Sequence, residues 1–157
     1  MVFAVVAIDE KRGLADDNGI PWDLPTDKKY FRDLVKDKDI LMGYGTYVEF
    51  TKPMTTGKSF VATSKAITKS GFIIVDDPTQ LLQNAKSDIW VIGGAGLFDA
   101  IWQLVDILYV TQIKGDFGCT KFMPVYTDDF VRIKKEIPLI ENGATFWYEV
   151  WERKKFS

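Results

Sequence analysis

The chain of 157 residues contains no histidine and a single cysteine, Cys119. Without histidine it lacks the commonest general acid or base and the commonest metal ligand of proteins. A structural zinc site and the Ser-His and Cys-His catalytic pairs are therefore excluded. One cysteine also rules out an internal disulfide framework and fits a reducing compartment. We expect no metal centre and a cytoplasmic location.

Long apolar runs and long basic runs are missing as well. No stretch approaches the roughly 18 apolar residues that a membrane span needs, and no basic leader precedes the apolar segment at residues 2–8. We expect neither a membrane span nor a signal peptide. The net charge is −2 and both signs are interspersed, which disfavours nucleic-acid binding. Arginine is scarce, and none lies between residues 33 and 131.

The segments that are present alternate between strand and helix patterns. The length suits one domain, which we place at residues 1–157. Strands are predicted at 2–9, 39–43, 59–64, 71–76, 88–94 and 106–113, and helices at 26–35, 44–50, 78–85 and 95–105. Two alternating strands, 130–137 and 144–153, follow around the turn sequence ENGA. This order predicts an α/β fold: a mostly parallel twisted sheet with flanking helices and a C-terminal antiparallel edge hairpin.

Small residues stand at the ends of several predicted strands. In open α/β sheets, ligands bind outside the carboxyl ends of the strands. These ends carry Asp9, Gly43, Thr63–Ser64, Gly93–Gly94 and Gln112–Ile113. Three of these positions are glycines or small hydroxyl residues, where a ligand can approach the backbone. We therefore expect the site at this edge of the sheet.

A first candidate motif is PWDLPTDKKYF, residues 21–31. Residues three and four apart share a helix face, so Asp27, Lys28 and Phe31 lie within reach of one another. Asp27 in the first helical turn can simply stabilise the helix dipole. It can also be a partly buried carboxylate that binds a cationic or amidine-like group. The spacing alone leaves both interpretations open.

Two glycine-containing strand ends form the second candidate. In VIGGAGLF (91–98) and DILMGYGTY (39–47), a strand runs into a helix through glycine. Free N–H groups at a helix start suit a phosphate. An ordinary tight turn fits the first motif equally well, and an ordinary strand-to-helix connection is the favoured interpretation of the second when it is taken alone. Neither is G-x-G-x-x-G, and the sequence places no acidic residue as a ribose ligand.

Together these motifs resemble the dihydrofolate reductase family over essentially the whole chain. The elements NGIPWDLPTD, MGYGTY, VIGGAGLF, LYVTQI, TKFMP and YEVW follow the family's order and spacing. The resemblance implies the family's fold and an NADPH-dependent reduction of 7,8-dihydrofolate, with hydride transfer to pterin C6 and protonation at N5. It implies folate and antifolate ligands, no nucleic-acid or membrane partner, and a monomer.

The resemblance also implies residue roles. Asp27 matches the catalytic carboxylate, which Thr111 would brace, and Trp22 would hold a bound water. Residues 10–24 would form a mobile loop that closes over the reacting rings. The substrate would contact Val5, Val6, Lys28, Phe31, Arg32, Phe50, Met54, Lys58 and Ile92. The cofactor would contact Ala7, Leu14, Ile20, Gly43, Gly45, Thr46, Thr63, Ser64, Lys65, Gly93, Gly94, Ala95, Gly96, Leu97 and Phe98, with a cis peptide at Gly93–Gly94.

Several positions depart from the family's pattern. Gly57 stands where an arginine clamps the substrate's glutamate tail, and Tyr44 and Gly96 stand where basic side chains often meet the 2′-phosphate of NADPH. Cys119 replaces an aspartate that ties the mobile loop, and Ala15 replaces a glycine of that loop. These changes affect the expected tail recognition, cofactor preference and loop closure. The alternatives are a non-catalytic pterin- or nucleotide-binding paralogue and a related pyrimidine reductase.

Overall fold

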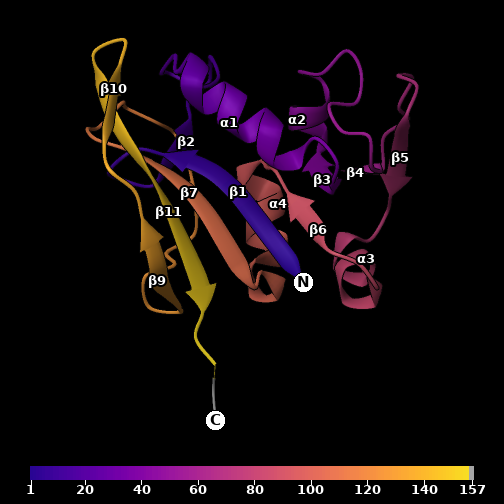
Figure 1. Ribbon diagram of the computed structural model, residues 1–157. Coiled ribbons are helices and arrows are strands. Elements are labelled where there is room, and N and C mark those ends of the chain that lie inside the picture. Colours follow the sequence, from indigo (N-terminus) through magenta and orange to yellow (C-terminus); the bar gives the residue numbers. More distant parts are fainter. Residues whose placement is uncertain (156–157) are drawn as a thin grey trace.

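Nine strands form the main sheet of the computed structural model, which describes residues 1–155. Their order is β10-β11-β7-β1-β6-β3-β4-β5, and β9 pairs with β11 (Figure 1). The strands are β1 (Val2–Ile8), β3 (Asp39–Gly43), β4 (Ser59–Ala62), β5 (Phe72–Val75), β6 (Ile89–Val91), β7 (Ile107–Ile113), β9 (Phe130–Lys135), β10 (Leu139–Glu141) and β11 (Ala144–Arg153). A small second sheet pairs β2 (Gly13–Ala15) with β8 (Lys121–Phe122).

The predicted α/β architecture is confirmed. β1 pairs in parallel with β6 and β7, and β3, β4 and β5 continue the parallel part. β11 runs antiparallel to β7 and to β9. The short strands β2, β8 and β10 were not expected. The predicted hairpin therefore differs in one respect. The turn at Asn142–Gly143 joins β10, and not β9, to β11, and β9 pairs with residues 149–153 of β11.

Four helices flank the sheet: α1 (Pro25–Val35), α2 (Tyr44–Tyr47), α3 (Pro78–Asn84) and α4 (Ala95–Ile101). Pro25 and Pro78 occupy the first turns of α1 and α3, where the missing proline N–H costs nothing. Asp77 caps α3 by accepting a hydrogen bond from the Gln80 N–H at 3.1 Å. The predicted helix at 95–105 ends early, because its last turn tightens into a 3₁₀ turn at residues 102–104. Among residues 1–155, no helix is long and apolar enough to cross a membrane.

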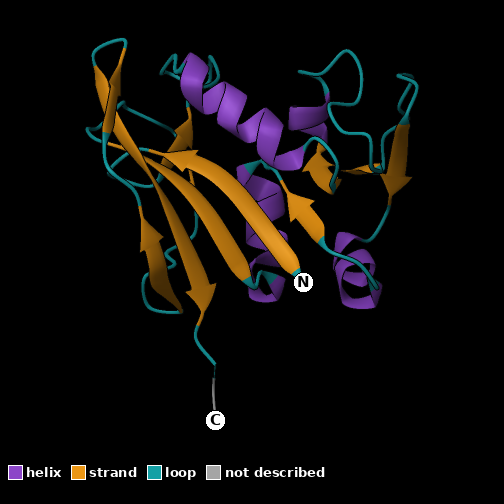
Figure 2. Ribbon diagram, in the orientation of Figure 1, coloured by secondary structure: helices purple, strands orange, loops and turns teal. Residues whose placement is uncertain are grey.

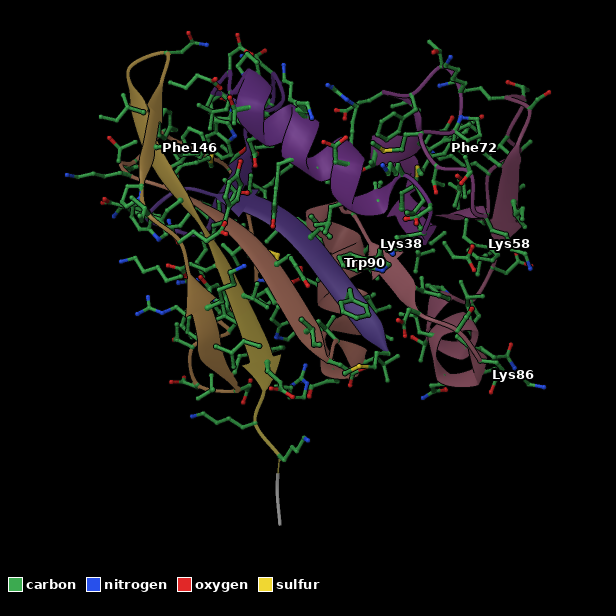
Figure 3. The ribbon with its side chains drawn as sticks, in the orientation of Figure 1. Lys38, Lys58, Phe72, Lys86, Trp90 and Phe146 are labelled. Carbon is green, nitrogen blue, oxygen red and sulfur yellow. The ribbon has the colours of Figure 1, made fainter. Side chains whose placement is uncertain are left out.

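The two faces of the sheet are covered by different helices (Figure 2). Val6 of β1 packs in the cluster with Phe98 and Ile101 of α4, whereas Val5 packs in the cluster with Val35 of α1. β1 is therefore buried on both faces, which explains its run of apolar residues without alternation. Trp90 of β6 stacks on Phe3 of β1 with ring centroids 4.3 Å apart (Figure 3).

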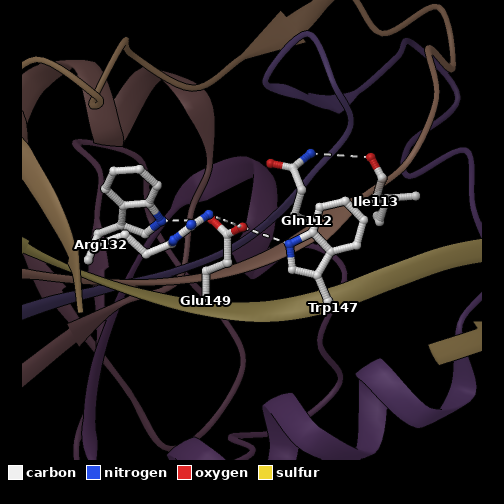
Figure 4. Close-up of polar contacts among 6 residues, drawn as sticks. Gln112, Ile113, Arg132, Trp147 and Glu149 are labelled. Carbon is white, nitrogen blue, oxygen red and sulfur yellow. Dashed lines mark hydrogen bonds and ion pairs between the residues drawn. The ribbon is translucent and has the colours of Figure 1, made fainter. Parts of the chain in front are cut away.

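A buried carboxylate organises the C-terminal edge of the sheet. Glu149 of β11 accepts hydrogen bonds from the indole N–H groups of Trp147 (2.6 Å) and Trp151 (2.8 Å). Arg132 of β9 pairs with the same carboxylate at 3.5 Å (Figure 4). Side chains two residues apart share one face of a strand, so the two tryptophans flank Glu149 on that face. The cluster thus joins β11 to β9.

Candidate active site

A cavity of about 1220 Å³ opens at the carboxyl ends of the parallel strands. Its floor includes Val5 and Val6 of β1 and Thr111 of β7, and α1 contributes Asp27 and Phe31. Binding outside these strand ends is the rule for open α/β sheets. The cavity is larger than most pockets for a single drug-sized ligand, so it can take an extended ligand or two adjacent ones.

Most residues predicted from the sequence line this one cavity. The structure brings together Val5, Val6, Ala7, Leu14, Ile20, Asp27, Lys28, Phe31, Gly43, Gly45, Thr46, Phe50, Thr63, Ser64, Ile92, Gly93, Gly94, Ala95, Gly96, Leu97, Phe98 and Thr111. They come from segments that are distant in the sequence and meet only because the strands run in parallel. Their individual roles remain predictions.

Five predicted residues lie outside the lining. Trp22 is buried and meets Phe117 edge-on at 5.4 Å, and Met54 packs in the cluster of Phe31 and Phe50. Arg32, Lys58 and Lys65 have exposed side chains, and the Lys65 Nζ lies 4.5 Å from the centre of the Tyr44 ring. These five residues are absent from the cavity lining. Arg32 and Lys65 directly follow the lining residues Phe31 and Ser64 in the sequence.

Asp27 is the carboxylate held against the floor of the cavity. It lies in the first turn of α1, and the Thr111 hydroxyl donates a hydrogen bond to its Oδ1 at 2.7 Å. Burial raises the pKa of Asp27 above its usual range; the hydrogen bond from Thr111 opposes this, and the charge of Glu141 adds to it. The carboxyl group therefore takes up a proton more readily than an exposed aspartate does.

The glycine pair closes another wall of the cavity. The Gly93–Gly94 peptide bond is cis, and Gly93 has a φ of +123°. The Gly43 N–H donates to the Gly93 carbonyl at 2.8 Å, which joins the ends of β3 and β6. Gly45 and Gly96 have no neighbouring atom within 4 Å of an added Cβ. The backbone is open to a ligand here, as a phosphate contact requires.

The loop at residues 10–24 is anchored by Asp9, which is almost completely buried. Its Oδ1 accepts hydrogen bonds from the N–H groups of Lys11 (2.9 Å) and Gly13 (2.8 Å), and its Oδ2 accepts one from Phe117 (3.1 Å). The Thr120 N–H also donates to the Ala15 carbonyl at 2.9 Å. The first half of the loop is thus held although no aspartate stands at position 119.

Cys119 packs beside this anchor. An added Cβ on Gly13 would overlap the Cys119 side chain, so the two segments are in close contact. Burial, with the nearby Asp9 charge, raises the pKa of Cys119 to about 11. The thiol is therefore protonated at neutral pH and unreactive, as a buried thiol without nearby cations should be.

Sequence reasoning missed several lining residues, namely Tyr30, Glu49, Ala62, Asp76, Pro78 and Lys121. Residues 15–19 of the predicted mobile loop and Tyr44 also line the cavity. Tyr30 stacks on Tyr148 at 3.9 Å, and burial raises the pKa of Tyr30 to about 12. Its spacing of three from Asp27 on α1 was a usable signal. Asp76 ends a predicted strand, which was a second usable signal.

Gly57 is packed too tightly to carry a side chain. An added Cβ would overlap the carbonyl group of Lys38. The Thr55 hydroxyl donates to that same carbonyl oxygen at 2.5 Å, and the Lys58 N–H donates to Asp39 Oδ1 at 2.9 Å. The chain around Gly57 therefore lies directly against the start of β3, and an arginine at position 57 would need this contact to open.

We expect Gly57→Ala to lower the free energy of unfolding by about 1–3 kcal/mol, the usual cost of overpacking. Urea unfolding monitored by tryptophan fluorescence measures it. Gly45→Ala is the matched control, because space is open around Gly45 in α2 and alanine favours helix there. Equal stability of the two variants would contradict the contact seen at Lys38.

The fold and the cavity define an α/β nucleotide-dependent enzyme, with a partly buried carboxylate and a glycine-lined wall at the carboxyl edge of the sheet. The family model described as dihydrofolate reductase matches residues 1–153. The chain therefore belongs to the dihydrofolate reductase family, whose members are NADPH-dependent oxidoreductases, and the resemblance seen in the sequence is confirmed.

Individual relatives support this placement. Dihydrofolate reductase of Bacillus subtilis is 29% identical over 163 residues, covering 100% of this chain and 97% of the relative. Segregation and condensation protein A of Mycoplasmoides gallisepticum is 26% identical over 159 residues. These residues cover 98% of this chain and 26% of that protein. The structure of dihydrofolate reductase from Enterococcus faecalis complexed with NADP(H) and RAB-propyl has a TM-score of 0.86, with 21% identity and coverage of 99% and 97%. That likeness establishes the shared fold.

Proposed function

We propose that the protein reduces 7,8-dihydrofolate to 5,6,7,8-tetrahydrofolate with NADPH and so supplies one-carbon metabolism. The observation that carries this proposal is the partly buried Asp27–Thr111 pair on the floor of the cavity. The family match supports the same activity. The match favours this activity over the alternative of a related pyrimidine reductase.

Asp27 is the proposed catalytic residue. A carboxylate held by Thr111 can accept hydrogen bonds from the N3 and 2-amino groups of the pterin, which orients the ring. Because burial raises its pKa, the same group can favour the protonated substrate. The reaction needs one hydride, delivered to C6, and one proton, which ends on N5. Water can supply that proton, so the absence of histidine from the chain is compatible with the reaction.

The residues at the other wall fit NADPH, which supplies the hydride from its nicotinamide C4 when bound. Thr46, Thr63 and Ser64 offer hydroxyl groups, and the open backbone at Gly45 and Gly96 leaves room for phosphates. Ala7, Leu14 and Ile20 would contact the nicotinamide. Ile20 is 62% exposed, so a bound ligand that covers it would gain apolar contact and exclude water.

A spectrophotometric assay tests the proposal. We expect NADPH absorbance to fall when dihydrofolate is added, and no change when either compound is left out. Binding of both compounds without turnover would instead favour the non-catalytic paralogue. We further propose that the protein acts as a cytoplasmic monomer that also binds antifolates; size-exclusion chromatography with light scattering measures its mass in solution.

We expect Lys28 to attract the glutamate tail of the substrate, because it is the basic residue of α1 that lines the cavity. Its side chain is exposed and pairs with Asp23 at 3.1 Å, so the attraction is weak. Lys28→Met should raise the KM for dihydrofolate about two- to fivefold and leave kcat unchanged. The KM of the parent enzyme should rise with salt.

Lys29→Met is the control for this prediction. Lys29 lies on the same helix, pairs with Asp33 at 2.7 Å and is absent from the cavity lining. A KM for dihydrofolate that responds equally to both substitutions would indicate a general charge effect rather than a contact with the tail.

A further inference from the structure

Asp76 lines the cavity at the end where β4 and β5 finish. Ala62 of β4 pairs with Val75 of β5, and the Thr63 N–H donates to the Val75 carbonyl at 3.2 Å. Asp76 and Thr63 are therefore the next residues of two adjacent parallel strands. Both line the cavity, together with Ser64 and Pro78.

The charge at this end of the cavity is negative. Asp76 has an exposed side chain and takes part in none of the ion pairs found among residues 1–155. The lining residues that follow β4 beside it, Thr63 and Ser64, are uncharged. The cation of this region, Lys65, lies over the Tyr44 ring and not in the lining. A ligand at this end thus meets a carboxylate without a paired cation.

A carboxylate at a strand end distinguishes a ribose with a free 2′-hydroxyl from one that carries a 2′-phosphate. In α/β nucleotide-binding proteins, an acidic side chain near the adenosine accepts a hydrogen bond from the ribose 2′-hydroxyl, whereas a basic one accommodates a 2′-phosphate. An ionised carboxylate can only accept hydrogen bonds. It therefore favours a hydroxyl donor and repels a phosphate dianion.

We propose that Asp76 is a specificity-determining residue for the cofactor: it accepts a hydrogen bond from the adenine ribose of NADH and opposes the 2′-phosphate of NADPH. The enzyme then uses NADH as well as NADPH, and the hydroxyl groups of Thr63 and Ser64, which line the cavity, keep the phosphorylated cofactor bound. This inference rests on the proposed function, because it places the adenosine half of the cofactor at the β4–β5 end.

Binding of nucleotide fragments to the whole protein tests the proposal without turnover. Adenosine 5′-monophosphate and adenosine 2′,5′-bisphosphate differ only by the 2′-phosphate, and calorimetry gives a Kd for each. Asp76→Asn keeps the shape of the side chain and removes its charge. The ratio of the two Kd values should shift about tenfold toward the bisphosphate, as expected for removing one charge a few ångströms from a dianion in water. The shift should shrink in high salt.

Asp77→Asn is the matched control. Asp77 is the adjacent exposed carboxylate, but it caps α3 and does not line the cavity. Asparagine caps a helix about as well as aspartate, so Asp77→Asn should leave the helix intact and the Kd ratio within about twofold of the parent value. In the full reaction, Asp76→Asn should shift the ratio of kcat/KM for NADPH over NADH by the same factor as the fragments.

The outcomes separate this inference from the proposed function. An unchanged Kd ratio in Asp76→Asn, or an equal shift in Asp77→Asn, overturns the role of Asp76 while the reductase activity stands. If neither fragment binds the parent protein, the cofactor is placed wrongly and the inference falls with that placement.

Discussion

Replacement of Asp27 by Asn should lower kcat/KM at neutral pH by about 10²-fold or more, as for other positioned acid–base groups. Asn keeps the size of the side chain and can still accept the hydrogen bond from Thr111, but it cannot carry the charge. Activity should recover partly at low pH, where solvent protonates the substrate. Steady-state rates measured across the pH range test this.

The same substitution should raise stability. Burial raises the pKa of Asp27 in the folded protein above the usual value of an aspartate. A carboxyl group with a raised folded pKa contributes its full stability below the unfolded pKa and loses it as pH rises through the folded pKa. At neutral pH the parent therefore holds a charge that folding disfavours, and Asp27→Asn removes it. Urea unfolding at acid and neutral pH should show that the gain is present only at the higher pH.

Asp33→Asn is the control for both measurements. Asp33 lies on the same helix, is exposed, pairs with Lys29 and is absent from the cavity lining. Its substitution should leave kinetics and the pH dependence of stability near the parent values. Wild-type turnover by Asp27→Asn at neutral pH would refute the catalytic role proposed for this carboxylate.

Glu149→Ala should lower the free energy of unfolding by about 3–6 kcal/mol. The carboxylate accepts two indole hydrogen bonds, and each hydrogen bond to a charged group contributes about 1.5–3 kcal/mol. Its removal leaves both N–H groups of Trp147 and Trp151 without this acceptor. Because β11 pairs with β7 and β9, the sheet should still unfold in one cooperative transition, and the urea midpoint of that transition should decrease.

Glu149→Gln separates charge from shape in this cluster. Glutamine keeps one acceptor oxygen and presents an NH₂ group to the other indole, so it should cost about half as much as alanine. Trp147→Phe removes one of the two donors, and the double variant with Glu149→Gln gives the coupling between them. Additive effects of the two substitutions would show that the hydrogen bond at 2.6 Å contributes little.

The sequence predicted the parallel part of the fold well because burial on both faces leaves a strong local pattern. The apolar run of β1 cannot be mistaken for a half-exposed strand. The short strands β2, β8 and β10 contain two or three residues and carry no measurable period. β2 and β8 exist because two distant loops pair with each other, which single-sequence patterns do not contain. β10 pairs locally with β11 across the turn at Asn142–Gly143.

The site was predictable where motifs coincide with strand ends and not where tertiary contacts decide. Asp27 and the glycine pair belong to local motifs. Asp76 ends a predicted strand, but its place beside Thr63 follows from the pairing of β5 with β4, and that register is not visible in the residues around it. Gly57 likewise follows from a contact with Lys38, nineteen residues earlier in the chain, rather than from a turn that requires glycine.

The sheet order has a consequence for synthesis of the protein. Val2 of β1 pairs with Ile89, and Phe3 pairs with Ile107, so neither edge of β1 has a partner until more than half of the chain has left the ribosome. At about 5–20 residues per second, the strand waits on the order of 5–20 seconds. An apolar strand with two open edges can pair with another chain during that time. The strand that later forms the floor of the cavity is thus the segment of the nascent chain that most needs a chaperone.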